Sequence, residues 1–373
     1  MDRPTAGGGL QQRSPAVMEL GTIGGKHTLT DNRYDRFNKL CMRQVMLAEH
    51  SSYAIGGEAP YFAMPQTVEE LSELLQVSKL YGMEVLVFGM GTNILFPDRP
   101  KADTLYISLK RLSELSASGG RWFASAGLPL SVLALAGLWS GSDDFHFTYL
   151  MPGSLGAGVY MNVKYHDVQM SDRLAAVHYI DCSDPALPLR KLAVADCEYS
   201  YKKSIFQQHP WIIVGGEFEL PEPEGEAIKQ RAEMLERYRQ EADSLSSLAS
   251  FYAFFTKEAS LIPACSGGLP APMQQIDDYR NGMRHFTHPS CGSFFKNYYP
   301  AGISIGAIVD RLGLKGTEHG GACISPYHGN MLLNMKQATA ADILYLKELI
   351  SEQIEREYGF VPEPEVVIVE GED

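Results

Sequence analysis

The chain has 373 residues, of which 45% are hydrophobic and 21% charged, and its formal net charge is -13. This length exceeds one small core and predicts two or three domains of an ordinary soluble globular enzyme. The acidic charge disfavours a nucleic-acid partner, because phosphate binding requires a basic face. No apolar run reaches the roughly 18 residues that cross a bilayer, so no membrane partner is expected.

The first 30 residues contain glycines and scattered polar residues without an apolar signal core, and we expect a flexible tail there. The cysteines show no C-x-x-C pair, which argues against a zinc site or a disulfide framework and is typical of a reducing cytoplasm. No bound metal is expected. The chain has six cysteines: Cys41, Cys182, Cys197, Cys265, Cys291 and Cys323.

The first half of the chain mixes helix and strand patterns. Thr67 and Glu70 have the spacing of a helix N-cap, leucines follow at helical spacing, and Gly82 is placed to end the helix. A short apolar run over 84–88 predicts a buried strand. Further strands are predicted over 104–109, 121–126, 174–181 and 211–220, and a helix over about 129–140. This mixture predicts an α+β or α/β fold.

The composition changes near residue 220. Residues 221–225 resemble a linker, a charged helix is predicted from 226 to about 248, and residues 262–272 are predicted to form an irregular loop. Near the end, Thr339 is placed to cap a helix that Gly359 ends, and a terminal strand follows over 366–369.

Two glycine-rich turns each follow an apolar run. Glycine lets the backbone come close to an anion, so several N–H groups can converge on one diphosphate. Neither turn has the spacing of a Rossmann fold or a P-loop, and the alternative interpretation is two tight turns without a ligand. The turns are Gly89-Met90-Gly91-Thr92-Asn93 and Pro152-Gly153-Ser154-Leu155-Gly156-Ala157-Gly158.

Two segments of the C-terminal third combine groups suited to proton transfer. Ser293 follows a glycine and precedes Lys296 and Asn297, and Glu365 lies between a proline and an apolar run. A hydroxyl, a carboxylate and an anion-binding lysine suit a site that protonates a carbon next to a carboxylate. Ser293 as a turn serine and Glu365 as a solvated strand-edge carboxylate are the structural alternatives. With the glycine turns, these groups favour a flavin-dependent reduction.

The order of these motifs resembles the UDP-N-acetylenolpyruvoylglucosamine reductase family over roughly residues 45 to 370. The resemblance is carried by Ile55-Gly56-Gly57-Glu58-Ala59, GMGTNIL at 89–95, PGSLGAG at 152–158, Asn162, YKKS at 201–204, GSFFKN at 292–297, GLKG at 313–316, GGACIS at 320–325, HGN at 328–330, Asn334 and EPEV at 363–366.

The resemblance implies an α+β fold with a vanillyl-alcohol-oxidase-type FAD-binding region of two subdomains and a C-terminal α/β substrate-binding domain. We expect the FAD-binding domain over residues 31–220 and the substrate-binding domain over residues 221–373. It also implies NADPH as co-substrate and reduction of UDP-N-acetylglucosamine enolpyruvate to UDP-N-acetylmuramate, a step of peptidoglycan synthesis in the cytoplasm. A monomer or weak homo-oligomer is expected.

The resemblance also assigns roles to residues. Ser293 matches the family's proton donor, Glu365 its acidic partner, and Lys202 stands where the family has an arginine. The candidate substrate-binding residues are Tyr201, Lys296, Asn297, Lys315, His328 and Asn330. The candidate FAD-binding residues are Ile55, Gly56, Gly57, Gly89, Met90, Gly91, Thr92, Asn93, Pro152, Gly153, Ser154, Gly156, Ala157, Gly158 and Asn162.

Two departures leave alternatives open. Lysine is a point charge, whereas arginine binds a carboxylate through two parallel hydrogen bonds, so either Lys202 takes that role less rigidly or Lys203 shares it. After Asn162 the chain reads Val163-Lys164-Tyr165-His166-Asp167 where the family has small residues ending Ala-Tyr-Gly. The segment from about 224 to 280 lacks family motifs and is a candidate insertion that covers the substrate. His166 and His285 show no spacing of ligand residues, and we expect them to be structural. The alternatives are a diverged flavoenzyme acting on another substrate and a non-catalytic flavin or nucleotide-sugar binding protein.

Overall fold

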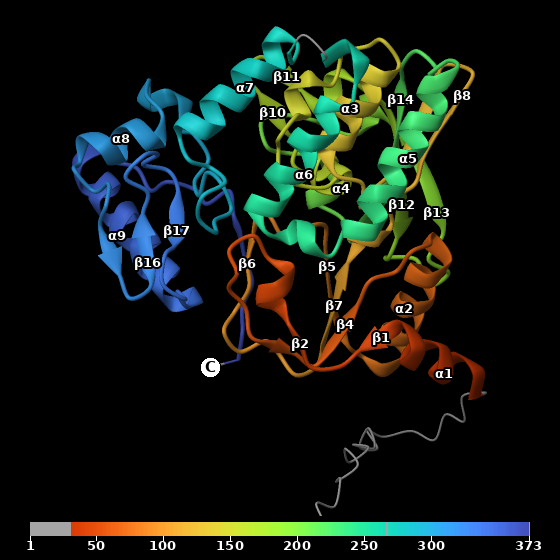
Figure 1. Ribbon diagram of the computed structural model, residues 1–373. Coiled ribbons are helices and arrows are strands. Elements are labelled where there is room, and N and C mark those ends of the chain that lie inside the picture. The colour runs from red at the N-terminus through yellow and green to blue at the C-terminus, as the bar shows by residue number, and fades with distance from the viewer. Residues whose placement is uncertain (1–30, 266–267, 373) are drawn as a thin grey trace, which may run out of the picture.

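The computed structural model describes residues 31–265 and 268–372. Figure 1 shows an N-terminal unit in red and orange at the bottom, a larger unit in yellow to cyan above it, and a blue C-terminal unit at the side. The flexible tail predicted for residues 1–30 lies outside the described residues. Helices and sheets are mixed in the way that the predicted α+β fold requires.

The N-terminal unit is built on a four-stranded sheet of order β1-β4-β7-β5, in which β4, β7 and β5 are parallel. Helix α2 begins as predicted, because the Thr67 hydroxyl accepts a hydrogen bond from the Glu70 N–H at 3.2 Å. Gly82 ends the helix with a left-handed φ of 65°. The elements are α1 (Asp31–Leu40), β1 (Cys41–Met42), β2 (Val45–Met46), β3 (Glu58–Ala59), β4 (Tyr61–Ala63), α2 (Val68–Tyr81), β5 (Glu84–Phe88), β6 (Ile94–Leu95) and β7 (Thr104–Ser108).

Strand β5 is less buried than its sequence predicts. It lies at the edge of the sheet, and Val85 keeps 36% of its surface exposed. The neighbouring β7 is the buried central strand, with all five residues covered. The strand predicted over 84–88 is therefore present, but the prediction that it is buried is wrong. An apolar run alone does not distinguish an edge strand from a central one.

The second unit contains a five-stranded antiparallel sheet of order β13-β12-β14-β9-β8. Helix α3 is apolar on every side and almost entirely buried, as expected for a helix inside a core. The elements are β8 (Leu115–Ser118), β9 (Arg121–Ser125), α3 (Leu130–Trp139), α4 (Leu155–Tyr160), β10 (Lys164–Tyr165), β11 (Val168–Gln169), β12 (Leu174–Asp181), β13 (Leu189–Ala193), β14 (Trp211–Glu219), α5 (Glu226–Glu241), α6 (Leu248–Ser260) and α7 (Ala271–Gly282).

The helices after residue 220 differ from the prediction. The helix predicted to reach about residue 248 ends at Glu241, where the Ser244 hydroxyl donates to the Glu241 carbonyl at 2.7 Å and competes with the helical bond. The loop predicted over 262–272 overlaps the start of α7. Pro272 sits in the first turn of that helix, where a missing N–H costs nothing.

Helices α5, α6 and α7 belong to the same hydrophobic core as the five-stranded sheet. Met234, Phe251 and Ile276 are buried in one cluster with Trp122 and Phe218 of that sheet. The first cluster therefore ends at Phe286, and the residues from Cys291 onward form a second cluster together with Tyr53, Ile55 and Leu95. The functional division at residue 220 stays a prediction.

The C-terminal unit packs α8 and α9 against a three-stranded sheet of order β15-β16-β17. Thr339 and Asp342 form a reciprocal capping box at the start of α9, as the sequence predicts, and Ile343, Leu346 and Ile350 are buried. Each such side chain stabilises the fold by about 1.5–3 kcal/mol. The elements are α8 (Ile305–Arg311), β15 (Glu318–His319), β16 (Ala322–Ile324), β17 (Leu332–Asn334), α9 (Ala340–Tyr358) and β18 (Val367–Ile368).

The last strand leaves the C-terminal unit and returns to the first. β18 pairs in parallel with β6, and the Val367 N–H donates to the Asn93 carbonyl at 3.0 Å. The terminal strand predicted over 366–369 is thus present, and it places the segment just before it at the junction of the units. No helix in the described part of the chain is long and apolar enough to cross a membrane.

Candidate active site

A pocket of about 440 Å³ lies where the three units meet. Thr92 and Asn93 come from the first unit, Tyr201 and Lys202 from the second, and Ser293 and Glu365 from the C-terminal segments. The pocket therefore brings together both glycine turns and all three candidate catalytic residues.

The segment that carries Ser293 is held between two other segments. The Phe294 N–H donates to the Asn330 carbonyl at 2.7 Å, and the Phe294 carbonyl accepts from the Glu365 N–H at 2.7 Å. Isolated bridges join Ser293 to Met331 and Phe295 to Pro364. Three motifs that are far apart in the sequence thus become neighbouring strands of backbone.

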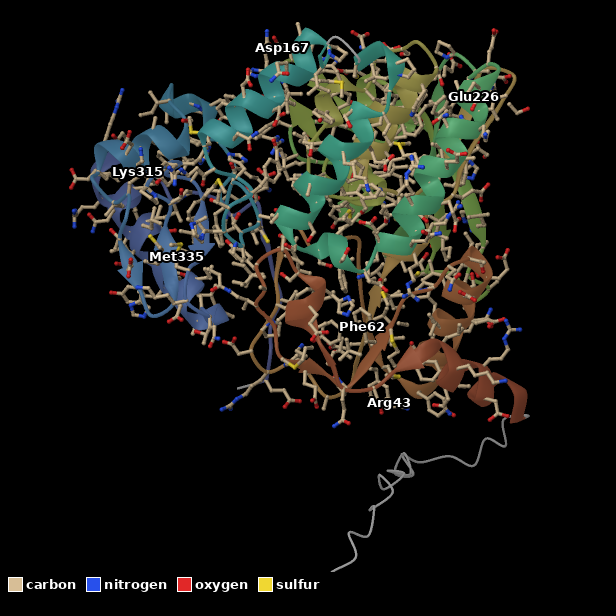
Figure 2. The ribbon with its side chains drawn as sticks, viewed as in Figure 1. Arg43, Phe62, Asp167, Glu226, Lys315 and Met335 are labelled. Carbon is tan, nitrogen blue, oxygen red and sulfur yellow. The ribbon has the colours of Figure 1, made fainter. Side chains whose placement is uncertain are left out.

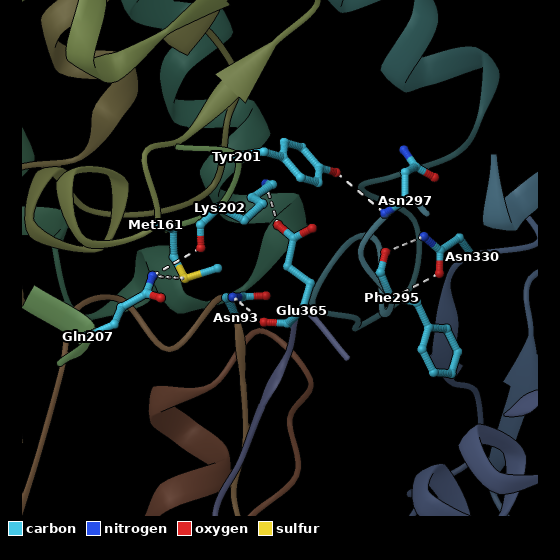
Figure 3. A network of polar contacts seen from close by, with 9 residues as sticks. All are labelled: Asn93, Met161, Tyr201, Lys202, Gln207, Phe295, Asn297, Asn330 and Glu365. Carbon is cyan, nitrogen blue, oxygen red and sulfur yellow. Dashed lines mark hydrogen bonds and ion pairs between the residues drawn. The ribbon is translucent and has the colours of Figure 1, made fainter. Parts of the chain in front are cut away.

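Asn330 fixes the middle of this arrangement. Its side-chain oxygen accepts from the Phe295 N–H at 2.9 Å, and its Nδ2 donates to the Phe295 carbonyl at 2.8 Å (Figure 3). The side chain is 3% exposed. Because both ends of the amide are bonded to the backbone, Asn330 positions the Ser293 segment while it lines the pocket.

Glu365 is held by groups from three units. Its carboxylate accepts from Lys202 Nζ at 2.5 Å, and the two side chains are 17% and 12% exposed respectively. Its backbone carbonyl accepts from Asn93 Nδ2 at 3.0 Å, and Figure 3 shows both contacts. The carboxylate therefore sits in a fixed place beside a cation.

Lys202 reaches this place from a tight turn. Ser200 and Lys203 exchange two backbone hydrogen bonds across it, and Lys202 has a left-handed φ of 58°, which is uncommon for a residue with a side chain. Asn162, which is 1% exposed, donates to the Ser200 carbonyl, and Gln207 donates to the Lys202 carbonyl. These bonds hold the turn so that Lys202 lines the pocket, whereas Lys203 is exposed outside the lining.

Ser293 faces the same pocket as Glu365. Its side chain is exposed, and its hydroxyl has no hydrogen-bond partner within residues 31–265 and 268–372. The preceding Gly292 has a φ of 71°, a conformation that glycine adopts without strain. The hydroxyl is therefore available to a ligand.

Tyr201 and Asn297 form another wall. The Tyr201 hydroxyl accepts from the Asn297 N–H at 3.4 Å, and the Asn297 side chain accepts from the Ile305 N–H. Burial, and then the neighbouring Tyr299, raise the pKa of Tyr201 to about 12. Tyr201 therefore remains protonated at neutral pH and can donate its own hydrogen.

Two lysines predicted to bind substrate lie outside this pocket. Lys296 is ion-paired with Glu363, and Lys315 with Asp310 at 3.1 Å. Figure 2 shows Lys315 on the C-terminal unit. Neither Lys296 nor Lys315 lines the pocket, whereas His328 does.

The two glycine turns contact each other. The Thr92 hydroxyl donates to the Pro152 carbonyl at 3.1 Å, and a Cβ on Gly89 would lie 1.9 Å from Ser154 Oγ. Gly91 has a φ of 71° and lies against the His50 carbonyl. Gly89 therefore serves the close packing of the two turns, and it lies outside the pocket lining with Met90, Gly91 and Gly156. The residues of the turns that line the pocket are Thr92, Asn93, Pro152, Gly153, Ser154, Ala157 and Gly158.

The other residues predicted to bind the cofactor lie outside this pocket. Ile55, Gly56 and Gly57 line a more open pocket of about 560 Å³ beside His288 and Asn334. Asn162 lies under the turn of Lys202.

Several pocket residues were missed or were given a structural role from the sequence. His166 and His285 line the pocket, and so do Lys164, Tyr279 and Arg280. No spacing of ligand residues marks them, because they meet only through the fold. In the described part of the chain, no group of His, Cys, Asp or Glu side chains could hold a metal ion.

Comparisons with known proteins decide the family. Residues 284–369 match the family model of the UDP-N-acetylenolpyruvoylglucosamine reductase C-terminal domain. The reductase of that name from Synechococcus sp. (strain CC9311) is 31% identical over 328 residues, covering 87% of this chain and 91% of the relative. The chain belongs to the UDP-N-acetylenolpyruvoylglucosamine reductase family.

Other relatives in the reductase family match over similar lengths. The Treponema denticola reductase is 30% identical over 325 residues, or 85% of this chain and 90% of the relative. The crystal structure of the reductase from Thermus caldophilus matches with a TM-score of 0.62 and 23% identity, covering 88% of this chain and 99% of that one. This likeness confirms the predicted α+β fold.

Proposed function

We propose that this chain reduces the enolpyruvyl ether of UDP-N-acetylglucosamine enolpyruvate to the lactyl ether of UDP-N-acetylmuramate, a step of peptidoglycan precursor synthesis. The observation that carries the proposal is the placement in one pocket of Glu365, Lys202 and a Ser293 hydroxyl that has no partner among the described residues. The names of the relatives supply the substrate class.

The pocket suits a flavin. Parts of both glycine turns line it, and Ser154 Oγ and Ser290 Oγ are buried there without a hydrogen-bond partner among the described residues. Buried hydroxyls that lack a partner are costly unless a ligand supplies one. FAD, held by Thr92, Asn93 and the lining residues 152–154, 157 and 158, would supply the hydride, with NADPH as its source.

Ser293 is suited to provide the proton. Adding hydride to the terminal carbon of the enolpyruvyl group leaves negative charge on the carbon beside the substrate carboxylate. A hydroxyl next to that carbon can donate its hydrogen and complete the new C–H bond. Because Ser293 is exposed to the pocket, it can regain a proton from water.

Glu365 and Lys202 act on the developing charge. The Lys202 ammonium lies where negative charge spreads into the substrate carboxylate, and a fixed cation stabilises such a species. Glu365 holds that ammonium in place and forms part of the same pocket wall as Ser293. The bonds from the Glu365 N–H to the Phe294 carbonyl and from the Lys296 N–H to the Glu363 carbonyl keep the Ser293 segment against the Glu365 segment.

An assay of the purified chain loaded with FAD tests the proposal. We expect NADPH consumption that depends on UDP-N-acetylglucosamine enolpyruvate and yields a product heavier by two hydrogens. NADPH consumption with a different enol ether alone would identify a diverged enzyme. A flavin that binds but stays oxidised with every donor would identify a binding protein and contradict the proposal.

A specific observation keeps the diverged enzyme as a second candidate. Lys164 and Tyr165, which replace small residues of the family pattern, line the pocket, and so does His166, which stands where the family has a tyrosine. Larger side chains there change the shape of the wall and thus the acceptor that fits. The assay with both acceptors distinguishes the two candidates.

A further inference from the structure

Three basic side chains meet on one wall of the pocket, and two of them, Arg280 and His285, lie outside the family motifs. Arg280 lies at the end of α7, His285 follows in the next loop, and His328 belongs to the HGN turn. Arg280 Nη1 and His285 Nδ1 are 3.5 Å apart, and the two imidazole rings are 5.6 Å apart, centroid to centroid. The cluster joins the helical segment to the C-terminal unit.

The hydrogen bonds of this cluster are incomplete. Arg280 Nε, His285 Nε2 and His328 Nδ1 are all buried and have no partner among the described residues. A guanidinium can only donate, so His285 Nδ1 must accept from Arg280. The hydrogen of the neutral imidazole therefore sits on Nε2, which leaves two donors, Arg280 Nε–H and His285 Nε2–H, without an acceptor.

The charge of Arg280 is also uncompensated. Lys202, Lys296 and Lys315 each have a carboxylate partner, whereas Arg280 has no ion pair within the described part of the chain. The nearest aromatic face is that of Tyr165, whose ring centroid lies 5.9 Å from the Arg280 guanidinium carbon. A covered cation with no counter-ion lowers stability, and proteins retain such groups where a ligand supplies the opposite charge.

We propose that Arg280, His285 and His328 form a subsite for the diphosphate group of a nucleotide ligand. A diphosphate offers several acceptor oxygens and at least two negative charges, which match the unpaired donors and the unpaired cation of the cluster. The planar guanidinium can bind phosphate oxygens through two parallel hydrogen bonds. This inference rests on the proposed function, because that function brings nucleotide diphosphates to this pocket.

Besides FAD, whose diphosphate the glycine turns would bind, two ligands of the proposed reaction carry a diphosphate. One is the UDP-sugar and the other is the nicotinamide dinucleotide. Lys164 also lines the pocket and is the competing cation. Binding measurements with UDP and with NADP⁺ separate the two sources, and uridine, which lacks phosphate, reports on contacts to the nucleoside alone.

Isothermal titration of the FAD-loaded chain with each probe tests the subsite. We expect Arg280→Met to weaken binding of UDP, of NADP⁺ or of both by about tenfold or more, while uridine binding changes by less than about twofold. Arg284→Met is the matched control, because Arg284 is exposed on the same loop and lies over the ring of Tyr327. This control should bind all three probes as the parent does.

Stability separates a binding role from a structural one. Removing an uncompensated buried charge should leave the thermal midpoint of Arg280→Met equal to or above that of the parent, whereas loss of a structural contact would lower it. His285→Phe keeps a ring and removes the free Nε2–H donor, so it provides a second variant. It should weaken diphosphate binding by about threefold or more.

Unchanged affinity for both UDP and NADP⁺ in Arg280→Met and His285→Phe would overturn the subsite. A loss of affinity for UDP or NADP⁺ that appears only in Lys164→Met would also overturn the subsite. The proposed function fails separately, if the parent binds UDP through Arg280 and yet does not reduce the enolpyruvyl sugar.

Discussion

At the scale of single residues, the Lys202–Glu365 ion pair is the contact on which the proposed chemistry depends. The two side chains come from segments 163 residues apart and are both largely covered. Removing one partner of a covered pair leaves the other charge without compensation, and such a change costs more than the pair itself contributes. Substitutions of Lys202 should therefore affect turnover directly.

We expect Lys202→Met to lower kcat by about tenfold or more, because the substrate carboxylate loses its cation. Lys202→Arg should keep or raise kcat, since it restores the group found in the family pattern. Lys203→Met is the control, because Lys203 is exposed outside the pocket lining. Steady-state kinetics checks all three, and full activity of Lys202→Met would remove this residue from the mechanism.

The two histidines of the proposed subsite give a prediction about pH. Burial, then Arg280 and His328, lower the pKa of His285 to about 3, and burial with Lys315 lowers the pKa of His328. The other titratable neighbours of Arg280 are Tyr165 and Tyr279. Both imidazoles are therefore neutral in the free protein at pH 7.

His285 stays neutral in the complex, because its Nδ1 accepts from Arg280 and cannot also carry a hydrogen. His328 Nδ1 has no partner among the described residues, so a bound diphosphate raises the pKa of His328 and binding should take up protons. The affinity contributed by the charge of His328 is then lost as the pH rises through the pKa of His328 in the complex. Titrations with UDP at pH 7 in buffers of different ionisation enthalpy should show net proton uptake that decreases in His328→Asn. Proton release, or equal uptake in parent and variant, would contradict this.

At the scale of secondary structure, the start of α9 shows how local signals set an element. The Asp342 carboxylate accepts from the Thr339 N–H at 3.0 Å and from the Gly321 N–H at 3.2 Å. These backbone bonds, that of Thr339 first, lower the pKa of Asp342. Because the folded pKa is lowered, the stabilisation is present above the unfolded pKa of about 4 and is lost as the pH falls through the folded pKa.

Asp342→Ala should therefore reduce the free energy of unfolding by about 1–2 kcal/mol at pH 7. The difference from the parent should shrink below about pH 4. Urea denaturation at several pH values measures both effects. Glu352→Ala, at an exposed position of the same helix, should change stability little, and an equal loss in that control would exclude the cap as the cause.

Elements with local signals were predictable, and those without them were not. Thr67, Thr339 and Gly82 mark the ends of α2 and α9, and the structure confirms them. Helices α6 and α7 were missed because α6 has few charged residues and α7 begins at Pro270-Ala271-Pro272, which reads as a loop. The exposure of β5 depends on its place in the sheet, which no local pattern contains.

At the scale of the whole molecule, the site is assembled by the return of the C-terminal strand to the first unit. Pairing of β18 with β6 and the bond from Asn93 to the Glu365 carbonyl fix the carboxylate relative to the glycine turns. A second contact between units lies nearby, where Ser52 Oγ donates to the Ser290 carbonyl at 2.6 Å. The position of the acidic group is thus a property of the tertiary fold.

The candidate catalytic residues could be predicted from the sequence, because Ser293, Glu365 and Lys202 each lie in a recognisable motif. The structure brings all three together in one pocket. Motifs could not show that Lys296 and Lys315 are ion-paired outside the pocket or that Asn330 is bonded to Phe295. Nor could they reveal Arg280 and His285, whose proximity to His328 arises only when α7 packs beside the C-terminal unit.

The proposed reduction depends most directly on the Ser293 hydroxyl, which delivers the proton that completes it. Anaerobic stopped-flow of Ser293→Ala separates reduction of the flavin by NADPH from its reoxidation by UDP-N-acetylglucosamine enolpyruvate. We predict a near-normal first half-reaction and a second half-reaction slowed by about 10²-fold or more. Equal losses in both half-reactions, or an unchanged second one, would contradict the account.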